Sequence, residues 1–198
     1  MIIHEDILLE RGAVIRKFKE DEFIFSEGNS PMYYFQIQSG VVKINNFFEN
    51  AKEFVHGFPF IGHCFGESYL LTEKKYAINA IAFTDCTVLR LEKKSFINLI
   101  YEDPEIFFKV SRYTAERLHF RYLISSFLAI PEPFIKIQKL LDHLKTYFGY
   151  HEKYSFLVPF TRLQLSLLTG LRIETVIRTL KKMEKNGSLK IIHSKIYC

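Results

Sequence analysis

Cysteine is scarce in this chain of 198 residues. Cys64, Cys86 and Cys198 lie far apart and form no C-x-x-C pair. This spacing predicts neither a disulfide framework nor a paired-cysteine metal site. Few, unpaired cysteines are typical of a protein in the reducing cytoplasm. We therefore expect a cytoplasmic protein without a metal or another cofactor.

Long hydrophobic runs are also missing. No apolar run reaches the roughly 18 residues that a membrane-spanning helix needs. The N-terminal sequence MIIHEDILLERG lacks the basic segment and long apolar stretch of a signal peptide. Hydrophobic residues make up 48% of the chain and charged residues 25%, which are the proportions of a globular protein. We expect no membrane partner.

Charge is modest in total but unevenly distributed. The formal net charge is +5, yet residues 129–198 hold 12 Lys or Arg against 5 Asp or Glu, a charge of +7. Residues 1–128 hold 15 against 17, a charge of −2. A basic C-terminal third on a slightly acidic remainder indicates that only this third meets a polyanion.

The first 95 residues or so are predicted to be rich in β-strands. Short apolar or alternating runs recur, separated by turn signals such as Ser39-Gly40. Many short strands at fairly even spacing favour an antiparallel barrel or sandwich. The runs lie at residues 23–25, 33–37, 41–44, 53–55, 79–83 and 87–91.

A long helix is predicted from Asp103-Pro104-Glu105 to about Leu128, because Asp caps helices and Pro suits the first turn. Phe107, Val110 and Thr114 should share one side of it. The later part is apolar on more than one side, which indicates two neighbours: the barrel and a second subunit. Complete burial inside one domain is the alternative. The residues that widen the apolar surface are Leu118, Phe120, Tyr122, Leu123, Ile124, Phe127 and Leu128.

Prolines at 131 and 133 break this helix and predict a hinge and domain boundary. A further helix should follow and end near Gly149. Residues 154–158 have the pattern of a short strand, and residues 189–192 and 195–197 that of a small hairpin.

The segment from Thr161 to Lys185 reads as two short helices joined by a tight turn. Thr161 and Gln164 have the spacing of a capping box, and Gly170 lies where the chain must turn sharply. In the second helix, residues 176, 180 and 183 form one apolar stripe, and the basic residues lie mostly off it. Such a helix suits the major groove of DNA, although a solvated surface helix would show the same pattern.

The order of these parts resembles one family, the cyclic-AMP receptor protein and fumarate–nitrate regulator (Crp/Fnr) family of bacterial transcription factors. Residues 22–28, 34–35 and 39–44 are similar to the family's opening strands, and residues 65–71 resemble its phosphate-binding cassette. Residues 174–176 with Arg178 resemble the start of its recognition helix. The similarity covers nearly the whole chain.

The resemblance implies an α+β fold in three parts. Residues 1–103 would form an antiparallel β-roll of the cyclic-nucleotide-binding type (a double-stranded β-helix) that senses an effector. Residues 104–130 would be the dimerisation helix, and residues 131–198 a winged helix-turn-helix. The implied partners are a second copy of the chain, double-stranded DNA with a two-fold symmetric operator, RNA polymerase and an unknown small-molecule effector.

The cassette departs from the family's cyclic-nucleotide binders. Amides around Gly66 can approach a phosphate, and Glu67 can accept a hydrogen bond from a ribose hydroxyl. Those binders place Arg, then Ser or Thr, near the end of the cassette, where Tyr76 and Ala77 stand here. The nearest cations are Lys74 and Lys75, and neither offers the planar fork with which Arg grips a phosphate in two places. We expect that cyclic AMP does not bind; a cyclic-nucleotide-responsive protein with a non-standard cassette is the alternative. The candidate effector pocket comprises Gly66, Glu67, Ser68, Tyr76 and Ala77.

The helix pair carries the candidate DNA contacts. Glu174 can accept a hydrogen bond from cytosine, and Arg178 can grip guanine or a phosphate. Ile173 cannot donate to guanine, but it can pack on a thymine methyl group. The full candidate set is Thr161, Arg162, Arg172, Ile173, Glu174, Thr175, Arg178 and Lys181.

Other sensing chemistries and functions find less support in the sequence. No cysteine precedes Cys64, whereas the family's iron–sulfur branch needs an N-terminal cluster. His63 or Cys64 could ligate haem, and Cys64 or Cys86 could sense thiol oxidation, but buried structural roles are commoner for such residues. Neither an H-x-H metal motif nor a G-x-S-x-G or P-loop motif occurs, so no enzyme is predicted. The remaining rival is a ligand-sensing protein of this fold that no longer binds DNA.

Overall fold

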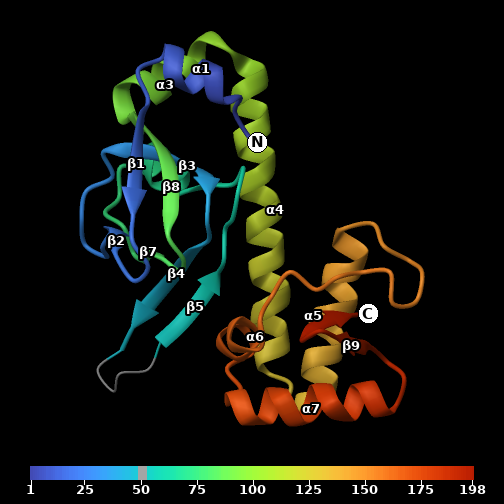
Figure 1. Ribbon diagram of the computed structural model, residues 1–198. Coiled ribbons are helices and arrows are strands. Elements are labelled where there is room, and N and C mark those ends of the chain that lie inside the picture. Colours follow the sequence, from blue (N-terminus) through green and yellow to red (C-terminus); the bar gives the residue numbers. More distant parts are fainter. Residues whose placement is uncertain (49–52) are drawn as a thin grey trace. The chain divides into compact units, whose positions relative to one another are not determined.

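The computed structural model describes residues 1–48 and 53–198 (Figure 1). The chain separates into two compact units, Met1–His119 and Phe120–Cys198. The boundary falls inside the longest helix, α4 (Pro104–Leu128). The division into 1–103, 104–130 and 131–198 therefore remains a functional prediction. Within the described residues, none of the helices is both long enough and apolar enough to span a membrane.

The first unit is built around two antiparallel sheets. Counted over the described residues, each has four strands, in the orders β1-β8-β3-β6 and β2-β7-β4-β5. All of the predicted strand runs lie in these sheets or at their ends, so the predicted antiparallel β-roll is confirmed. The strands are β1 (Val14–Phe18), β2 (Phe23–Phe25), β3 (Tyr33–Ser39), β4 (Val42–Phe47), β5 (Glu53–Gly57), β6 (Cys64–Phe65), β7 (Asn79–Ala82) and β8 (Cys86–Glu92).

Three short helices that the sequence did not indicate complete the roll. They are α1 (Glu5–Glu10), α2 (Glu67–Thr72) and α3 (Lys93–Glu102). The start of the chain is held by tertiary contacts: Ile3 N donates to Gln36 Oε1 at 3.0 Å, and Gln36 Nε2 donates to Ile3 O at 2.8 Å. Leu8 of α1 is fully buried. Because these contacts join distant parts of the chain, a local sequence pattern does not reveal them.

The helix α4 begins and ends where the sequence predicts. Asp103 Oδ1 accepts hydrogen bonds from the backbone N–H groups of Glu105 and Ile106, at 3.0 and 3.2 Å. Ile106, Val110 and Tyr113 form its buried stripe in the first unit. The prediction that Phe107 shares this side is wrong, because Phe107 is 44% exposed and the stripe begins one position earlier.

The second unit is a three-helix bundle with a wing. After the last turns of α4 come α5 (Pro133–Tyr147), α6 (Arg162–Thr169), α7 (Ile173–Lys185), β9 (Lys190–Ile192) and β10 (Lys195–Tyr197). The two strands pair as the predicted hairpin, with Ile192 opposite Lys195. Leu157 forms an isolated antiparallel bridge with Tyr197, so the expected strand at 154–158 is present as a single pairing. The predicted winged helix-turn-helix is thereby confirmed.

Local capping explains the helix pair. Thr161 Oγ1 accepts from Gln164 N at 3.2 Å, and Gln164 Oε1 accepts from Thr161 N at 2.8 Å, which completes the predicted capping box. Gly170 ends α6 with φ of 67°, in the left-handed region that glycine adopts without steric cost. The helices pack through a shared apolar core that includes the buried side chains of Ile137, Leu140, Leu165, Val176, Leu180 and Met183.

Candidate DNA interface and effector cassette

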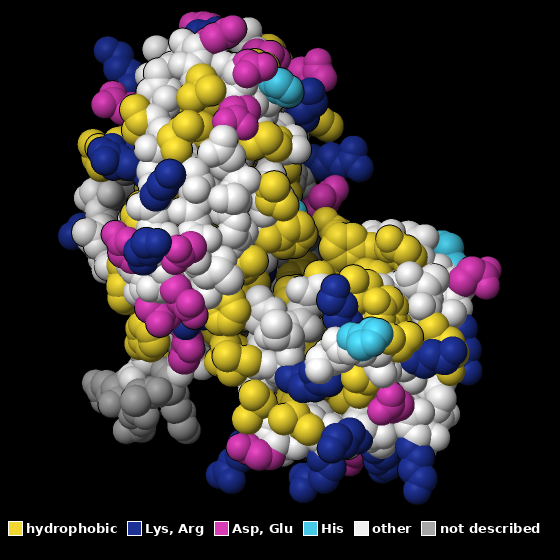
Figure 2. Space-filling model, in the orientation of Figure 1, with side chains coloured by type: hydrophobic (Ala, Val, Ile, Leu, Met, Phe, Trp, Pro, Cys, Tyr) yellow, Lys and Arg dark blue, Asp and Glu magenta, His cyan; other side chains and the backbone are white. Residues whose placement is uncertain are grey.

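The helix α7 has one buried and one charged face. Val176 and Leu180 are fully buried and Met183 is 2% exposed, as the apolar stripe predicts. Arg178 and Lys181 lie on the exposed side. Figure 2 shows Lys and Arg side chains gathered along the lower edge of the second unit, where Figure 1 places α7. The buried stripe thus leaves a basic helix face open to a polyanion.

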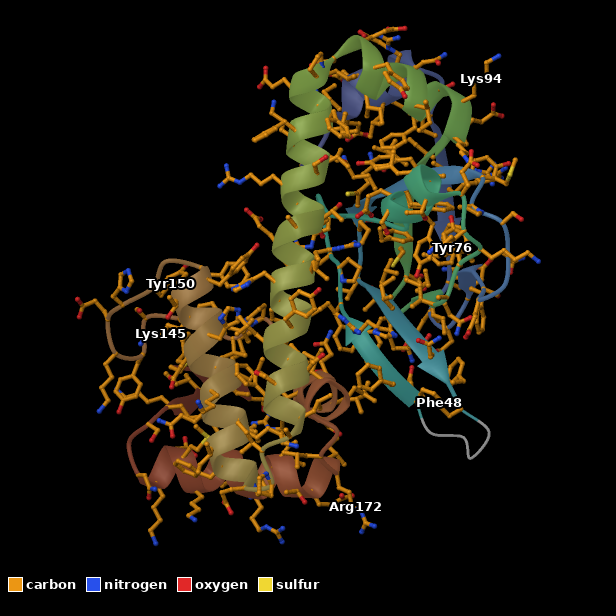
Figure 3. The ribbon with its side chains drawn as sticks, turned by 180° about the vertical axis from the view of Figure 1, so that it is seen from behind. Phe48, Tyr76, Lys94, Lys145, Tyr150 and Arg172 are labelled. Atoms are coloured by element: carbon orange, nitrogen blue, oxygen red, sulfur yellow. The ribbon has the colours of Figure 1, made fainter. Side chains whose placement is uncertain are left out.

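Six of the eight predicted DNA contacts lie at the starts of the two helices. Thr161 caps α6, and Arg162 is its first residue. Arg172 occupies the cap position of α7 and is exposed, with its side chain directed into solvent in Figure 3. Ile173, Glu174 and Thr175 make up the first turn of α7; Glu174 is exposed and the other two are half-buried.

The wing is fixed to both helices. Arg162 Nη1 donates to Ser194 O at 3.0 Å, and Ile191 N donates to Glu184 Oε1 at 3.0 Å. His193 and Ser194 form the tip with φ of 47° and 64°, and both are exposed. One N–H of Arg162 is therefore engaged with the wing, and its charge stays close to the basic face.

A recess of about 350 Å³ lies beside the exposed face of α7. It is lined by Thr175, Arg178, Thr179 and Lys182 and by residues 132–134. Lys182 Nζ is 5.5 Å from the ring centroid of Phe134. Arg178 and Lys182 bring two positive charges to this recess, which extends the basic surface from the face of α7 toward the start of α5.

The cassette begins at Gly66, which has φ of 75° and precedes α2. A Cβ atom at this position would lie 3.1 Å from the ring of Phe25 and 3.3 Å from that of Tyr76. The glycine is therefore required both by its backbone conformation and by the rings packed against it.

Aromatic rings fill the interior of the roll beside the cassette. The rings of Phe25 and Tyr76 stack with centroids 3.8 Å apart and planes at 8°, and Phe35 stacks on Phe65 at 5.3 Å. Tyr76 is only 3% exposed and lies among the strands of the roll in Figure 3. Tyr76, which the resemblance matches to the phosphate-binding arginine of cyclic-nucleotide binders, thus has its side chain in the interior itself.

The five predicted pocket residues do not converge on one space. Ala77 is exposed, and its carbonyl oxygen accepts from Asn46 Nδ2 at 2.8 Å. Ser68 is half-buried in the first turn of α2. Gly66, Glu67 and Tyr76 are buried.

Glu67 is engaged by side chains of α4. It is fully buried, and its Oε1 accepts from Thr114 Oγ1 at 2.7 Å and pairs with Arg117 Nη2 at 3.1 Å. Arg117 Nη1 also donates to Cys64 O at 2.9 Å. Glu67 Oε2 and the Tyr76 hydroxyl have no hydrogen-bond partner within the described residues. Burial, and then the nearby Glu67 charge, raise the pKa of Tyr76.

Arg117 was not identified from the sequence as the partner of Glu67, although its position on α4 offered an indication. Arg117 continues the stripe of Ile106, Val110 and Tyr113 at helical spacing. A cation on an otherwise buried stripe requires a buried partner. The sequence alone does not say that this partner is Glu67, fifty positions earlier.

Burial shifts the pKa of each of the three residues considered for sensing, His63, Cys64 and Cys86. Burial, with a smaller effect from the Arg117 charge, lowers the pKa of His63 to about 4. Burial raises the pKa of both the Cys64 and the Cys86 thiols, which makes them poor nucleophiles. In the part of the chain that the structure describes, no three His, Cys, Asp or Glu residues group as metal ligands.

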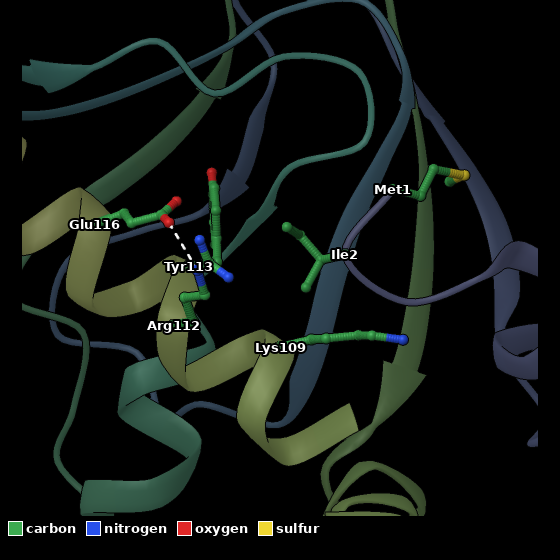
Figure 4. Close-up of a pocket in the computed structure, with 6 residues that line it drawn as sticks. All are labelled: Met1, Ile2, Lys109, Arg112, Tyr113 and Glu116. Atoms are coloured by element: carbon green, nitrogen blue, oxygen red, sulfur yellow. Dashed lines mark hydrogen bonds and ion pairs between the residues drawn. The ribbon is translucent and has the colours of Figure 1, made fainter. Parts of the chain in front are cut away.

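A second recess, on the first unit, has a volume of about 190 Å³ (Figure 4). It is lined by Met1, Ile2, Lys109, Arg112, Tyr113 and Glu116. Arg112 Nε donates to Glu116 Oε1 at 3.1 Å. Its volume falls below the roughly 300 Å³ at which ligand pockets usually begin, and none of the cassette residues lines it.

Comparison with known proteins finds one family model and a bacterial regulator that this chain resembles. The family model of the cyclic nucleotide-binding domain matches residues 15–103. The nitrogen fixation regulation protein FixK of Bradyrhizobium diazoefficiens is 24% identical over 187 residues, which span 90% of this chain and 75% of FixK. The chain thus carries a match to the cyclic nucleotide-binding domain in its N-terminal half and is similar to this transcriptional regulator over most of its length.

Solved structures of Crp/Fnr proteins share the fold over nearly the whole chain. FixK2 from Bradyrhizobium japonicum has a TM-score of 0.75 at 20% identity, over 93% of this chain and 91% of that one. A CooA mutant from Carboxydothermus hydrogenoformans has a TM-score of 0.80 at 16% identity, over 98% and 85%. The chain therefore shares the fold of these two proteins, with its roll, long helix and winged helix-turn-helix.

Proposed function

We propose that the protein is a homodimeric, sequence-specific DNA-binding regulator of transcription whose sensor domain does not bind cyclic AMP. The observation that carries the proposal is the helix pair of a Crp/Fnr protein with an exposed basic face on its second helix, built from Arg178, Lys181 and their neighbours. The protein would act in the cytoplasm, together with RNA polymerase. This function involves no enzymatic chemistry.

Dimerisation is supported by exposed apolar side chains along one face of α4. Phe108, Leu118 and Tyr122 on this face are 71%, 51% and 66% exposed. With Ser111 and Ala115 they recur at alternating steps of three and four residues, the spacing of a coiled-coil seam. A second copy of α4 would cover these side chains and bring two recognition helices to half-sites about 34 Å apart.

Rejection of cyclic AMP is supported by three features of the cassette. The ring of Tyr76 stacks on Phe25 in the roll interior. Glu67, which would meet the ribose, pairs with Arg117 and Thr114. The cations nearest in the sequence, Lys74 and Lys75, are exposed. A cyclic nucleotide would have to displace the rings and break the buried ion pair before it could bind.

Binding to genomic DNA fragments across a range of salt concentrations tests the first part of the proposal. Binding should be selective for some fragments, and its affinity should fall steeply with salt as counterions are released. A lack of binding to every fragment, or binding that salt does not weaken, would favour the ligand-sensing protein without DNA binding. The charge of +7 on residues 129–198 argues against that alternative.

Thermal unfolding with and without cyclic AMP tests the second part. A ligand that binds the folded state raises the unfolding midpoint in proportion to the logarithm of its concentration. We expect no change with cyclic AMP. A rise that follows this logarithmic dependence would support the cyclic-nucleotide-responsive alternative, with a non-standard cassette around Tyr76 and Ala77.

A further inference from the structure

A buried lysine joins three helices of the second unit. Lys136, in the first turn of α5, is 8% exposed. Its Nζ donates to Leu128 O at 3.3 Å and to Thr169 O at 3.4 Å. Leu128 is the last residue of α4, and Thr169 is the last residue of α6. The ammonium group of Lys136, which belongs to α5, therefore donates to the carboxyl-terminal ends of both α4 and α6.

An ammonium group is well suited to the carboxyl-terminal ends of helices. The last carbonyl groups of a helix have no donor within the helix, and the carboxyl-terminal end carries a partial negative charge that favours a cation. An ammonium group has three N–H donors, so it can serve two such ends at once. Lysine is rarely buried without partners of this kind. An apolar side chain at position 136 would leave both carbonyl groups without this donor.

The hydrogen bonds of Lys136 are directional, whereas the other contacts described among α4, α5 and α6 are apolar. Ile124 of α4 lies in the same hydrophobic core cluster as Ile137 and Leu165. Apolar packing is non-directional and tolerates small shifts, whereas a hydrogen bond weakens steeply when its angle changes. The apolar cluster therefore supplies most of the attraction, and Lys136 restricts the angle.

We propose that Lys136 is a positioning residue that sets the angle between the last turns of α4 and the helix pair α6–α7, and thereby the spacing of DNA half-sites that the dimer accepts. The inference rests on the proposed function. Each base pair inserted between half-sites moves one of them by about 3.4 Å and turns it by about 35°. A dimer with a restricted angle discriminates among such spacings, and one with a relaxed angle does not.

The experiment uses the full-length protein and a DNA site selected with the wild-type protein from random duplexes. A series of sites carries the two half-sites at this spacing and with one base pair added or removed. We compare the wild type with Lys136→Met, which lacks the donors, Lys136→Arg, which keeps a cation of different shape, and Lys139→Met. Lys139 is an exposed lysine of the same helix and is the matched control.

The readout is the ratio of affinities between spacings, which a general loss of stability does not change. The wild type and Lys139→Met should prefer one spacing by about tenfold, comparable to one mismatched base pair. Lys136→Met should lower this ratio to about threefold or less, and Lys136→Arg should broaden or shift the preference.

Affinities that fall in parallel at all spacings would overturn the inference and make Lys136 a purely structural residue. If circular dichroism shows that Lys136→Met does not fold, the ratio of affinities between spacings is measured with Lys136→Arg and is interpreted in the same way. Failure of both variants to fold also counts against the inference. If the wild type binds none of the DNA, the proposed function has failed and this inference falls with it.

Discussion

Removal of Arg117 should destabilise the roll by leaving Glu67 buried without its counter-charge. Arg117→Met keeps most of the side-chain length but loses the bonds to Glu67 and to Cys64 O. Breaking a buried ion pair from one side costs about 3–5 kcal/mol. Because the Arg117 side chain is itself 33% exposed, we expect the lower end, about 3 kcal/mol.

A double-mutant cycle isolates the interaction. Glu67→Gln alone should cost about 1–2 kcal/mol, since the amide keeps an acceptor for Thr114 but loses the charge. The double variant should cost about 2–3 kcal/mol, less than the sum of the single changes, because no uncompensated charge remains. The free energy of unfolding in urea, measured by circular dichroism, gives all four corners of the cycle.

The result that would refute the reasoning is additivity. If the single costs sum to the double cost within about 0.5 kcal/mol, the two residues do not interact across the roll and α4. The cassette glutamate would then be free to meet a ligand. The proposal that cyclic AMP does not bind would then rest on the aromatic stack alone.

Three further outcomes follow from the structure. Arg178→Ala should relax specificity at one base by about 1–3 kcal/mol in a competition assay; an equal loss for all sequences would make Arg178 a phosphate contact. Leu118→Glu should convert a dimer to a monomer in analytical sedimentation, because it puts a charge into the seam of α4; an unchanged dimer would contradict that seam. The pKa of His63 is lowered to about 4 in the folded state, so protonation favours the unfolded state. Stability should be fully present above about pH 6.5 and decrease by about 2–3 kcal/mol as the pH falls to about 4. His63→Gln should flatten this part of the pH profile, and an unchanged slope would assign it to other groups.

Local patterns were enough to predict the elements of the proposed DNA interface. The capping box at Thr161 and Gln164, the turn at Gly170 and the apolar stripe of α7 each depend on residues within one or two turns. The start of α4 at Asp103 is equally local. Such features are fixed by nearby backbone geometry and hydrogen-bonding groups, so the sequence carries them directly.

The contacts that define the cassette could not be predicted in this way. Glu67 meets Thr114 and Arg117, and Tyr76 meets Phe25, each pair being joined only by the fold. Lys136 reads as one of several lysines on an amphipathic helix, and only the structure shows that it is buried between helix ends. A departure from the family's motif indicates that a ligand contact is missing, but it does not say what takes the place of the ligand.

The strand order of the roll also affects how the chain folds while it is being synthesised. Val14 of β1 pairs with Arg90 of β8, 76 positions later in the chain. At the usual ~5–20 residues per second of synthesis, β1 waits roughly 4–15 s for its partner strand to be made. Val14 and Ile15 are close to half exposed even in the finished roll. The contacts of the helical second unit are nearer in sequence and should form faster once they are made. The nascent chain is therefore most open to aggregation before its ninetieth residue has emerged, and a chaperone would act on that interval.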